Sequence, residues 1–269
     1  MKKTILNILF ILSGNRFSQH VLEKAFTLIR LMLGIGSGSL PSGSGESKIF
    51  DVLIKMTEKW NEPIIIFDIG ANEGQFLRLV QEKLKSFNYQ VYAFEPTNAS
   101  FQELRERFSG FDCISLEKLG LDDINHSSKI FYDSPKSVRA SKYQRDLRHL
   151  GVEFSLSEEV SYVTLDDYCE VNHIKTIDLL KIDVEGNEFN VLKGGEKLLS
   201  RNAVRLISFE FSRAHIDSKT FFKDIYYFLS EHGMKSLYRV LSYGYLKPIE
   251  EYDEKNEMFF PTNYLAVMR

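Results

Sequence analysis

Short, continuous apolar runs are the clearest pattern along this chain. Residues 64–67 (IIIF) and 177–182 (IDLLKI) are rich in branched aliphatic side chains, which is typical of parallel strands covered on both faces. Amphipathic stretches lie between such runs and predict helices that cover a sheet. The pattern therefore predicts an α/β fold with a doubly wound, Rossmann-like sheet of seven strands, the last two forming a hairpin. The predicted strands are 64–67, 90–94, 113–119, 177–182, 204–211, 236–240 and 264–268, with helices at 49–59, 98–108, 188–192 and 218–232.

An extension precedes the first predicted strand. Residues 4–12 and 21–33 predict two short amphipathic helices, which we expect to pack on the main domain. The first apolar run is too short to span a bilayer and lacks a cleavage site, so weak contact with a membrane surface is the alternative. Residues 34–47 are rich in glycine and serine, typical either of a flexible linker or of an ordered loop that approaches a ligand. We therefore expect an extension over 1–47 and a Rossmann-like domain over 48–269.

An insertion at about 125–163 interrupts the alternation of strands and helices. Alternating patterns at 129–132 and 160–163 predict strands on either side of a basic stretch. The basic residues recur at three-residue steps and would share one face of any helix formed there: Lys136, Arg139, Lys142, Arg145 and Arg148. Such a stretch is either a solvated helix face or a lid that recruits an anionic substrate, for example a phosphorylated or acidic sugar.

The turn after the first predicted strand has the character of a nucleotide-binding turn. Gly70 and Gly74 stand where a Cβ would obstruct a ligand or close packing, and Glu95 ends the next strand, where an acid accepts hydrogen bonds from ribose hydroxyls. The third glycine of the dinucleotide fingerprint is missing, which disfavours NAD. Asp68 can face a sulfonium or ammonium group, so the turn favours S-adenosylmethionine. Asp122 either meets the adenine amino group or belongs to a solvated turn.

Composition and charge narrow the function further. The chain is 43% hydrophobic and 26% charged, enough to bury a full core, and its net charge of −3 provides no general attraction to nucleic acid. The two cysteines, Cys113 and Cys169, form neither a disulfide framework nor a zinc pattern, which favours a reducing, cytoplasmic location. No D-x-D motif of a glycosyltransferase is present. Nothing in the sequence determines the oligomeric state.

Several motifs, in order, resemble the FkbM family of S-adenosylmethionine-dependent methyltransferases. They are FDIGANEGQF, AFEPTNASFQEL, VTLDDY and LLKIDVEGNEFNVLKGG, and with the strand ending in Phe209-Glu210 they cover roughly residues 64 to 210. The resemblance implies O-methylation, commonly of sugar hydroxyls in polysaccharides, glycolipids or natural products. It also implies a cofactor loop formed by Asp68, Gly70, Asn72 and Gly74, with Glu95 on the ribose and with Asp183 and Glu185 beside the transferred methyl group.

Methyl transfer requires an aligned acceptor oxygen and help with its deprotonation. We expect Asp183 or Glu185 to accept the proton, or the pair to bind a divalent metal that lowers the pKa of the hydroxyl, with Glu210 and His215 completing either arrangement. The alternatives are that Asp183 only contacts the cofactor, that Glu185 only stabilises a helix N-terminus, and that Glu210 and His215 are structural. Three functions remain: a sugar or glycoconjugate O-methyltransferase, which is favoured, a methyltransferase on another small molecule, and a non-catalytic cofactor-binding module.

Overall fold

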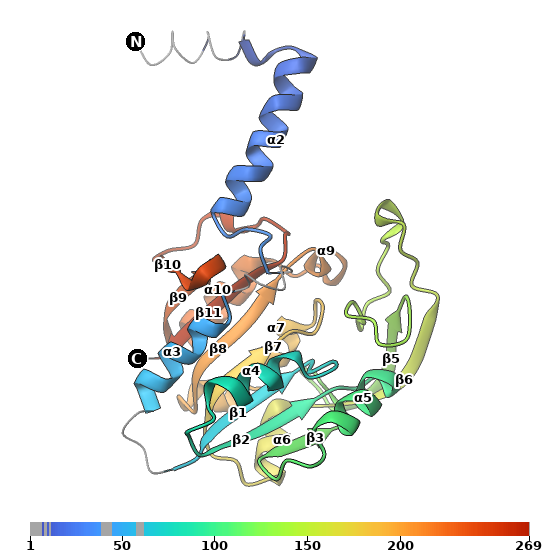
Figure 1. The fold of residues 1–269 in the computed structure, drawn as a ribbon, viewed down its shortest axis with the longest axis vertical. Coiled ribbons are helices and arrows are strands. Elements are labelled where there is room, and N and C mark those ends of the chain that lie inside the picture. Colours follow the sequence, from blue (N-terminus) through green and yellow to red (C-terminus); the bar gives the residue numbers. More distant parts are fainter. Residues whose placement is uncertain (1–6, 8–9, 11, 39–44, 58–61, 269) are drawn as a thin grey trace.

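The central strands of the protein are apolar on both faces. In β7 (Ile177–Ile182) every residue is buried, and β7 pairs in parallel with β1 (Ile64–Ile69), which is nearly as buried. Strands of this kind need a covering layer on each side. The computed structural model describes residues 7, 10, 12–38, 45–57 and 62–268, and places these two strands inside an eight-stranded sheet with helices on both faces (Figure 1).

The strand order of this sheet is β10-β9-β11-β8-β7-β1-β2-β3. The five strands from β8 to β3 are parallel, whereas β11 is antiparallel to both of its neighbours. This arrangement confirms the Rossmann-like α/β fold. From β1 the sheet grows to one side through β2 and β3 and to the other side through β7 and β8, and a crevice opens at the carboxyl ends of the strands where the strand order switches in this way. The other strands are β2 (Tyr89–Phe94), β3 (Ile114–Glu117), β8 (Val204–Phe211), β9 (Met234–Val240), β10 (Leu246–Ile249) and β11 (Thr262–Met268).

All seven predicted strands belong to this sheet, but one strand escaped prediction. β10 is a four-residue edge strand that contains Pro248, has no buried residue and pairs antiparallel with β9. Proline is confined to edges of sheets, and a short edge strand without an apolar face carries little periodic signal. The hairpin at this end is therefore β9–β10, and β11 inserts between β9 and β8 instead of following β9 directly.

Helices cover the sheet through two separate apolar clusters. One cluster joins Ile66 of β1 to Leu53, Leu77 and Leu104 from the first three helices of the domain. The other joins the adjacent Phe67 to helices that follow in the second half of the chain, because successive side chains of a strand point to opposite faces. These helices are α3 (Ser47–Thr57), α4 (Gln75–Lys83), α5 (Asn98–Phe108), α6 (Leu165–Val171), α7 (Glu188–Lys193), α8 (Glu196–Ser200), α9 (Ala214–Ser218) and α10 (Phe222–Glu231).

The insertion forms a small sheet of its own beside the main one (Figure 1). β4 (Gly120–Leu121), β5 (His126–Tyr132) and β6 (Leu156–Val163) lie in the order β4-β6-β5. The basic stretch between β5 and β6 is irregular apart from one 3₁₀ turn at Arg148–Leu150, so its helical interpretation is wrong. The cations reach acids in different segments, which is incompatible with one shared helix face: Lys136 pairs with Glu103, Arg139 with Asp133, Lys142 with Asp122, Arg145 with Glu185, and Arg148 with Asp146.

The N-terminal extension differs from the expectation as well. The predicted helix at 21–33 is a longer helix, α2 (Arg16–Met32), which projects away from the domain and has no buried residue (Figure 1). The expectation that it packs on the main domain is therefore wrong. The predicted helix at 4–12 falls mostly outside the described residues. Within the described part of the chain, no helix combines the length and apolarity needed to cross a membrane.

Candidate active site

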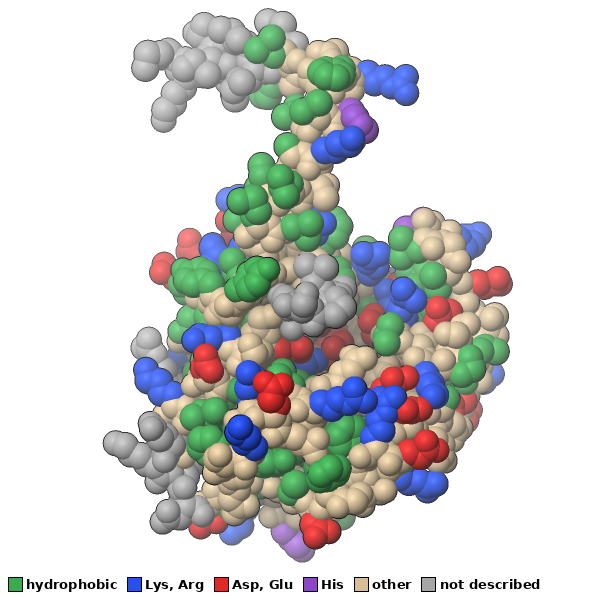
Figure 2. Space-filling model, in the orientation of Figure 1, with side chains coloured by type: hydrophobic (Ala, Val, Ile, Leu, Met, Phe, Trp, Pro, Cys, Tyr) green, Lys and Arg blue, Asp and Glu red, His purple; other side chains and the backbone are tan. Residues whose placement is uncertain are grey.

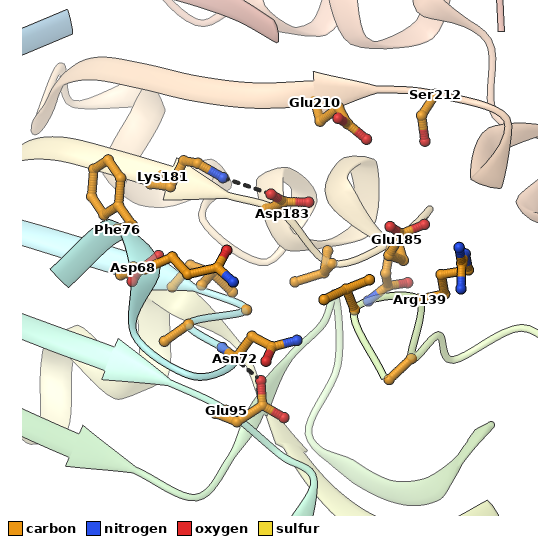
Figure 3. A pocket seen from close by; sticks show the side chains of 18 of the residues that line it. Asp68, Asn72, Phe76, Glu95, Arg139, Lys181, Asp183, Glu185, Glu210 and Ser212 are labelled. Atoms are coloured by element: carbon orange, nitrogen blue, oxygen red, sulfur yellow. Dashed lines mark hydrogen bonds and ion pairs between the residues drawn. The ribbon is translucent and has the colours of Figure 1, made fainter. Parts of the chain in front are cut away.

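A cleft of about 1,210 Å³ opens at the carboxyl ends of the parallel strands. Its walls come from the turn after β1, the tips of β2, β7 and β8, and the irregular part of the insertion. The glycine- and serine-rich stretch also contributes, because Gly38 and residues 45–47 line the cleft. This agrees with the expectation of an ordered loop that approaches a ligand. Figure 2 shows the resulting hollow between the main domain and the insertion, and Figure 3 shows the side chains inside it.

The predicted glycine turn forms the floor of the cleft. Gly70 has φ = +85°, and a Cβ there would overlap the backbone oxygen of Asp183 at the tip of β7. Gly74 has φ = +81°, and its Cβ would collide with the ring of Phe108. Both glycines therefore allow close packing of the turn rather than only the approach of a ligand. The turn leads into the helix α4, whose first residues, Gln75 and Phe76, line the cleft.

Glu95 lies at the tip of β2, where the sequence predicts the ribose-binding acid, and is 6% exposed. Its Oε2 accepts from the backbone N–H of Asn72 at 3.0 Å, and its Oε1 accepts from the N–H and hydroxyl of Thr97 (Figure 3). A carboxylate has about four acceptor sites, so Glu95 can still receive a hydroxyl group from the cleft. Its orientation is set before any ligand arrives.

Asp68 carries the clearest unsatisfied group of the cleft. It is 1% exposed, and its Oδ2 has no hydrogen-bond partner among the described residues. Burial raises the pKa of Asp68 to about 7, although the nearby Lys181 opposes the shift. A buried carboxylate oxygen without a donor is costly, and it is a fitting partner for a cationic group. The site thus fits the amino-acid end of S-adenosylmethionine, with Asp68 on its positive charge and Glu95 on its ribose.

Three carboxylates face one another beyond the turn. Asp183 and Glu185 follow β7 and Glu210 comes from β8, and one oxygen of each lies within 4.8 Å of the others (Figure 3). Burial and the neighbouring negative charges raise the pKa of Glu210 well above its usual range, and burial raises the pKa of Glu185 to about 7. Carboxylates this close share protons and titrate as a group.

Two cations position two members of this group. Lys181 lies on β7 with its Nζ 2.9 Å from Asp183 Oδ2, and Arg145 of the insertion places its Nη1 2.6 Å from Glu185 Oε2. Both cationic side chains are almost fully buried, so the two ion pairs are held in place by packing. Lys181 was not among the predicted site residues, although a lysine within an otherwise apolar strand is a visible signal.

Three predicted site residues do not line the cleft: Asp122, His215 and Gly74, whose role is the packing against Phe108. Asp122 is fully buried behind its wall, where it binds Asn187, Lys142 and His126 of the protein itself, so its proposed contact with adenine is wrong. His215 is 1% exposed and its Nε2 lies 3.0 Å from Oε2 of Glu188. This pair lies under the turn after β7, so His215 is structural and not part of the carboxylate group.

Glu188 is a structural residue that sequence reasoning missed. Its two oxygens accept from the backbone N–H groups of Val184 and Gly186, at 3.0 and 2.9 Å. These bonds shape the turn that presents Glu185, whose φ of +52° is unusual for a residue other than glycine. The local signal is the acid at the start of a helix directly after a turn.

Residues 68–236 match the methyltransferase FkbM domain. This stretch contains the turn, the tips of β2, β7 and β8, and the insertion. The chain belongs to the FkbM methyltransferase family. It is therefore an S-adenosylmethionine-dependent methyltransferase, and the resemblance seen in the motifs is confirmed.

Curated relatives agree with this assignment. The chain is 29% identical to the 2-O-methyltransferase NoeI of Sinorhizobium fredii over 61% of its length and 69% of the relative. It is 25% identical to the hexuronic acid methyltransferase AglP of Haloferax volcanii over 67% of each chain. It is 30% identical to the 31-O-demethyl-FK506 methyltransferase FkbM of Streptomyces tacrolimicus over 49% of this chain and 59% of that one.

A crystal structure of an FkbM methyltransferase from Methylobacillus flagellatus KT aligns with 81% of this chain and 47% of its own. The TM-score is 0.48 and the sequence identity is 14%.

Proposed function

We propose that this methyltransferase acts on a hydroxyl group of a sugar or glycoconjugate. The observation that carries the proposal is the group Asp183, Glu185 and Glu210, which borders the cofactor turn and can receive a hydroxyl proton. By name, one relative is a 2-O-methyltransferase and another a hexuronic acid methyltransferase, so oxygen atoms of sugar-like molecules are the favoured acceptors. A small molecule that is not a sugar is the alternative, since the third relative acts on a demethyl-FK506.

Within the group, Glu210 is the favoured general base. Lys181 pairs with Asp183 and Arg145 pairs with Glu185, whereas burial, and after it the negative charges of both acids, raise the pKa of Glu210. The ionised form of a carboxylate with a raised pKa is the stronger base, and its population grows as the pH rises. The bound cofactor supplies a methyl group on a positively charged sulfur. The protein then has to hold the acceptor oxygen in line with that methyl and take its proton.

The cleft also favours an acceptor that carries negative charge. Arg78, Arg139 and Arg213 line it, and Figure 2 shows basic side chains beside the hollow. Arg139 is bound to Asp133 only at 3.4 Å and keeps 46% of its side chain exposed, so it can turn toward a ligand. Carboxylate or phosphate groups on the acceptor would bind such guanidinium groups with two parallel hydrogen bonds.

A divalent metal is a second way to activate the acceptor. Asp183, Glu185 and Glu210 would hold it, since their oxygens lie within 4.8 Å of one another and Mg²⁺ prefers carboxylate ligands. A bound metal would lower the pKa of the acceptor hydroxyl in place of a general base.

The proposal is tested by methyl transfer from isotopically labelled S-adenosylmethionine to a panel of neutral sugars, uronic acids, sugar phosphates and non-sugar alcohols. We expect labelled product with a sugar hydroxyl, at higher kcat/KM for the anionic acceptors. Arg139→Gln should remove most of that preference and leave neutral acceptors unchanged. Transfer only to the non-sugar alcohols would overturn the proposal.

The same assay separates the base from the metal. Turnover that survives EDTA and disappears in Glu210→Gln supports a general base. Turnover that EDTA abolishes and Mg²⁺ restores assigns the group to a metal. Asp112→Asn, which removes a carboxylate at an exposed position outside the cleft, serves as the matched control and should retain full activity.

A further inference from the structure

The helix α2 (Arg16–Met32) has an apolar surface that none of the described residues covers. It has 17 residues, projects from the domain and contains no buried residue (Figures 1 and 2). Aromatic and aliphatic side chains along it are exposed by about half or more: Phe17, Val21, Phe26, Leu28, Ile29 and Met32. Large apolar surfaces of this kind mark interaction sites in soluble domains.

These side chains are gathered on one half of the helix. With 3.6 residues per turn, the apolar positions from Phe17 round to Phe26 cover roughly 180° of the circumference. The opposite half carries polar side chains, among them Gln19, Glu23 and Thr27, and Lys24 lies at the border of the apolar half beside Phe17. A two-helix seam uses a narrower apolar stripe, whereas a half-and-half division is typical of helices that lie in a membrane interface.

The charge of this region is opposite to that of the rest of the chain. Residues 1–33 contain five lysines or arginines and a single acid, Glu23, although the whole chain has a net charge of −3. The positive charge of this region is therefore complementary to an anionic partner. A second copy of the chain carries the same excess of positive charge in this region and therefore offers no complementary charge.

The helix is attached to the domain at a defined place. Near its end Arg30 stacks on the ring of Phe260 at 3.7 Å and donates to the backbone oxygen of Ile35 at 2.7 Å. Gly36 N–H then donates to the hydroxyl of Thr262, which pairs with Phe211 at the carboxyl end of β8. The base of α2 therefore lies at the same end of the sheet as the mouth of the cleft.

We propose that the apolar face of α2 inserts into the surface of an anionic lipid bilayer and holds the cleft close to that surface. Lipid acyl chains cover the aromatic and aliphatic half, and acidic headgroups meet Arg16 and Lys24. The inference does not depend on the acceptor of the methyl group. It places the enzyme where an acceptor carried on a lipid would be within reach.

Sedimentation of the full-length protein with vesicles tests the proposal. One set of vesicles contains phosphatidylcholine alone, and the other contains equal parts of phosphatidylcholine and phosphatidylglycerol. Leu28→Glu adds a negative charge to the apolar face, and Gln19→Glu adds the same charge to the polar face as a matched control. Because both variants add one negative charge, the ratio of their affinities for the vesicles measures the apolar contact alone. We expect Gln19→Glu to bind about tenfold or more tightly than Leu28→Glu.

We expect the original chain to bind the phosphatidylglycerol vesicles with an affinity that falls as salt is added. Leu28→Glu should lose most of this affinity, whereas Gln19→Glu should lose about fivefold, the effect of one charge. Both variants should bind S-adenosylmethionine like the original chain, because α2 does not line the cleft. Equal binding by the two variants, or no binding to either vesicle, would overturn the proposal. If the original chain instead does not bind vesicles but self-associates without lipid, and Leu28→Glu abolishes that self-association, the apolar face binds a second copy of the chain.

Discussion

Replacing Asp68 with asparagine should stabilise the ligand-free protein while it weakens cofactor binding. Asp68 is almost fully buried, and its Oδ2 lacks a hydrogen-bond partner among the described residues. Burial raises the pKa of Asp68 from its ordinary 3.8 to about 7. The folded protein therefore bears the cost of a poorly solvated charge, which the neutral amide of asparagine avoids.

The size and sign of the effect follow from this shift. A folded pKa above the unfolded value means that the folded state holds the proton more tightly, so stability is lost as the pH rises from about 4 to about 7. At 1.36 kcal/mol per pKa unit the cost is about 4 kcal/mol at pH 8 and about 1.5 kcal/mol at pH 5. The gain from Asp68→Asn should therefore be about 2.5 kcal/mol larger at pH 8 than at pH 5.

Urea denaturation without cofactor, at pH 5 and pH 8, measures this difference. Asp112→Asn makes the same chemical change at an exposed position and should stay within about 0.5 kcal/mol of the original chain at both values. Adding S-adenosylmethionine should make the original chain the more stable of the two, because it binds the ligand more tightly and therefore gains more free energy of unfolding from it. A pH-independent effect, or a less stable Asp68→Asn variant at pH 8, would show that Asp68 is not a destabilising buried charge.

Three further predictions concern the carboxylate group and its surroundings. Glu210→Gln should lower kcat by about 10²–10⁴ and leave the Kd for S-adenosylmethionine, measured by calorimetry, within about threefold; a matching loss of binding would contradict its role as base. The kcat/KM should rise with pH through about 7, since burial raises the pKa of Glu185 to about 7 and that of Glu210 well above its usual range; a flat profile between pH 5 and 8 would argue against both. His215→Phe should cost about 3 kcal/mol in urea denaturation, because Glu188 loses its buried partner, and equal stability would exclude that pairing.

Much of the architecture could be predicted from local sequence. The apolar runs of β1 and β7 place two strands, and the acids after them fall at the carboxyl ends because parallel strands all end at one edge. The turn with Gly70 and Gly74 was recognisable because only glycine fits its backbone. Each of these signals is contained within a few neighbouring residues.

The basic insertion shows where such local reasoning stops. Its charges recur at three-residue steps, yet the stretch is irregular because Lys142 and Arg145 reach Asp122 and Glu185, acids from distant segments. The same holds for α2, whose periodicity predicts a helix without stating whether a partner covers it. Periodicity describes one element, whereas its neighbours depend on the whole chain.

Local sequence alone predicted the α/β class, seven strands of the main sheet, the cofactor turn and the family. Which polar side chains meet depends on the tertiary structure. It brought Glu210 beside Asp183 and Glu185 from separate strands, and it enclosed His215 away from the cleft. The physical reason is that strand formation is a local property of side-chain pattern, whereas the distance between two charges is set by the order in which the strands pair.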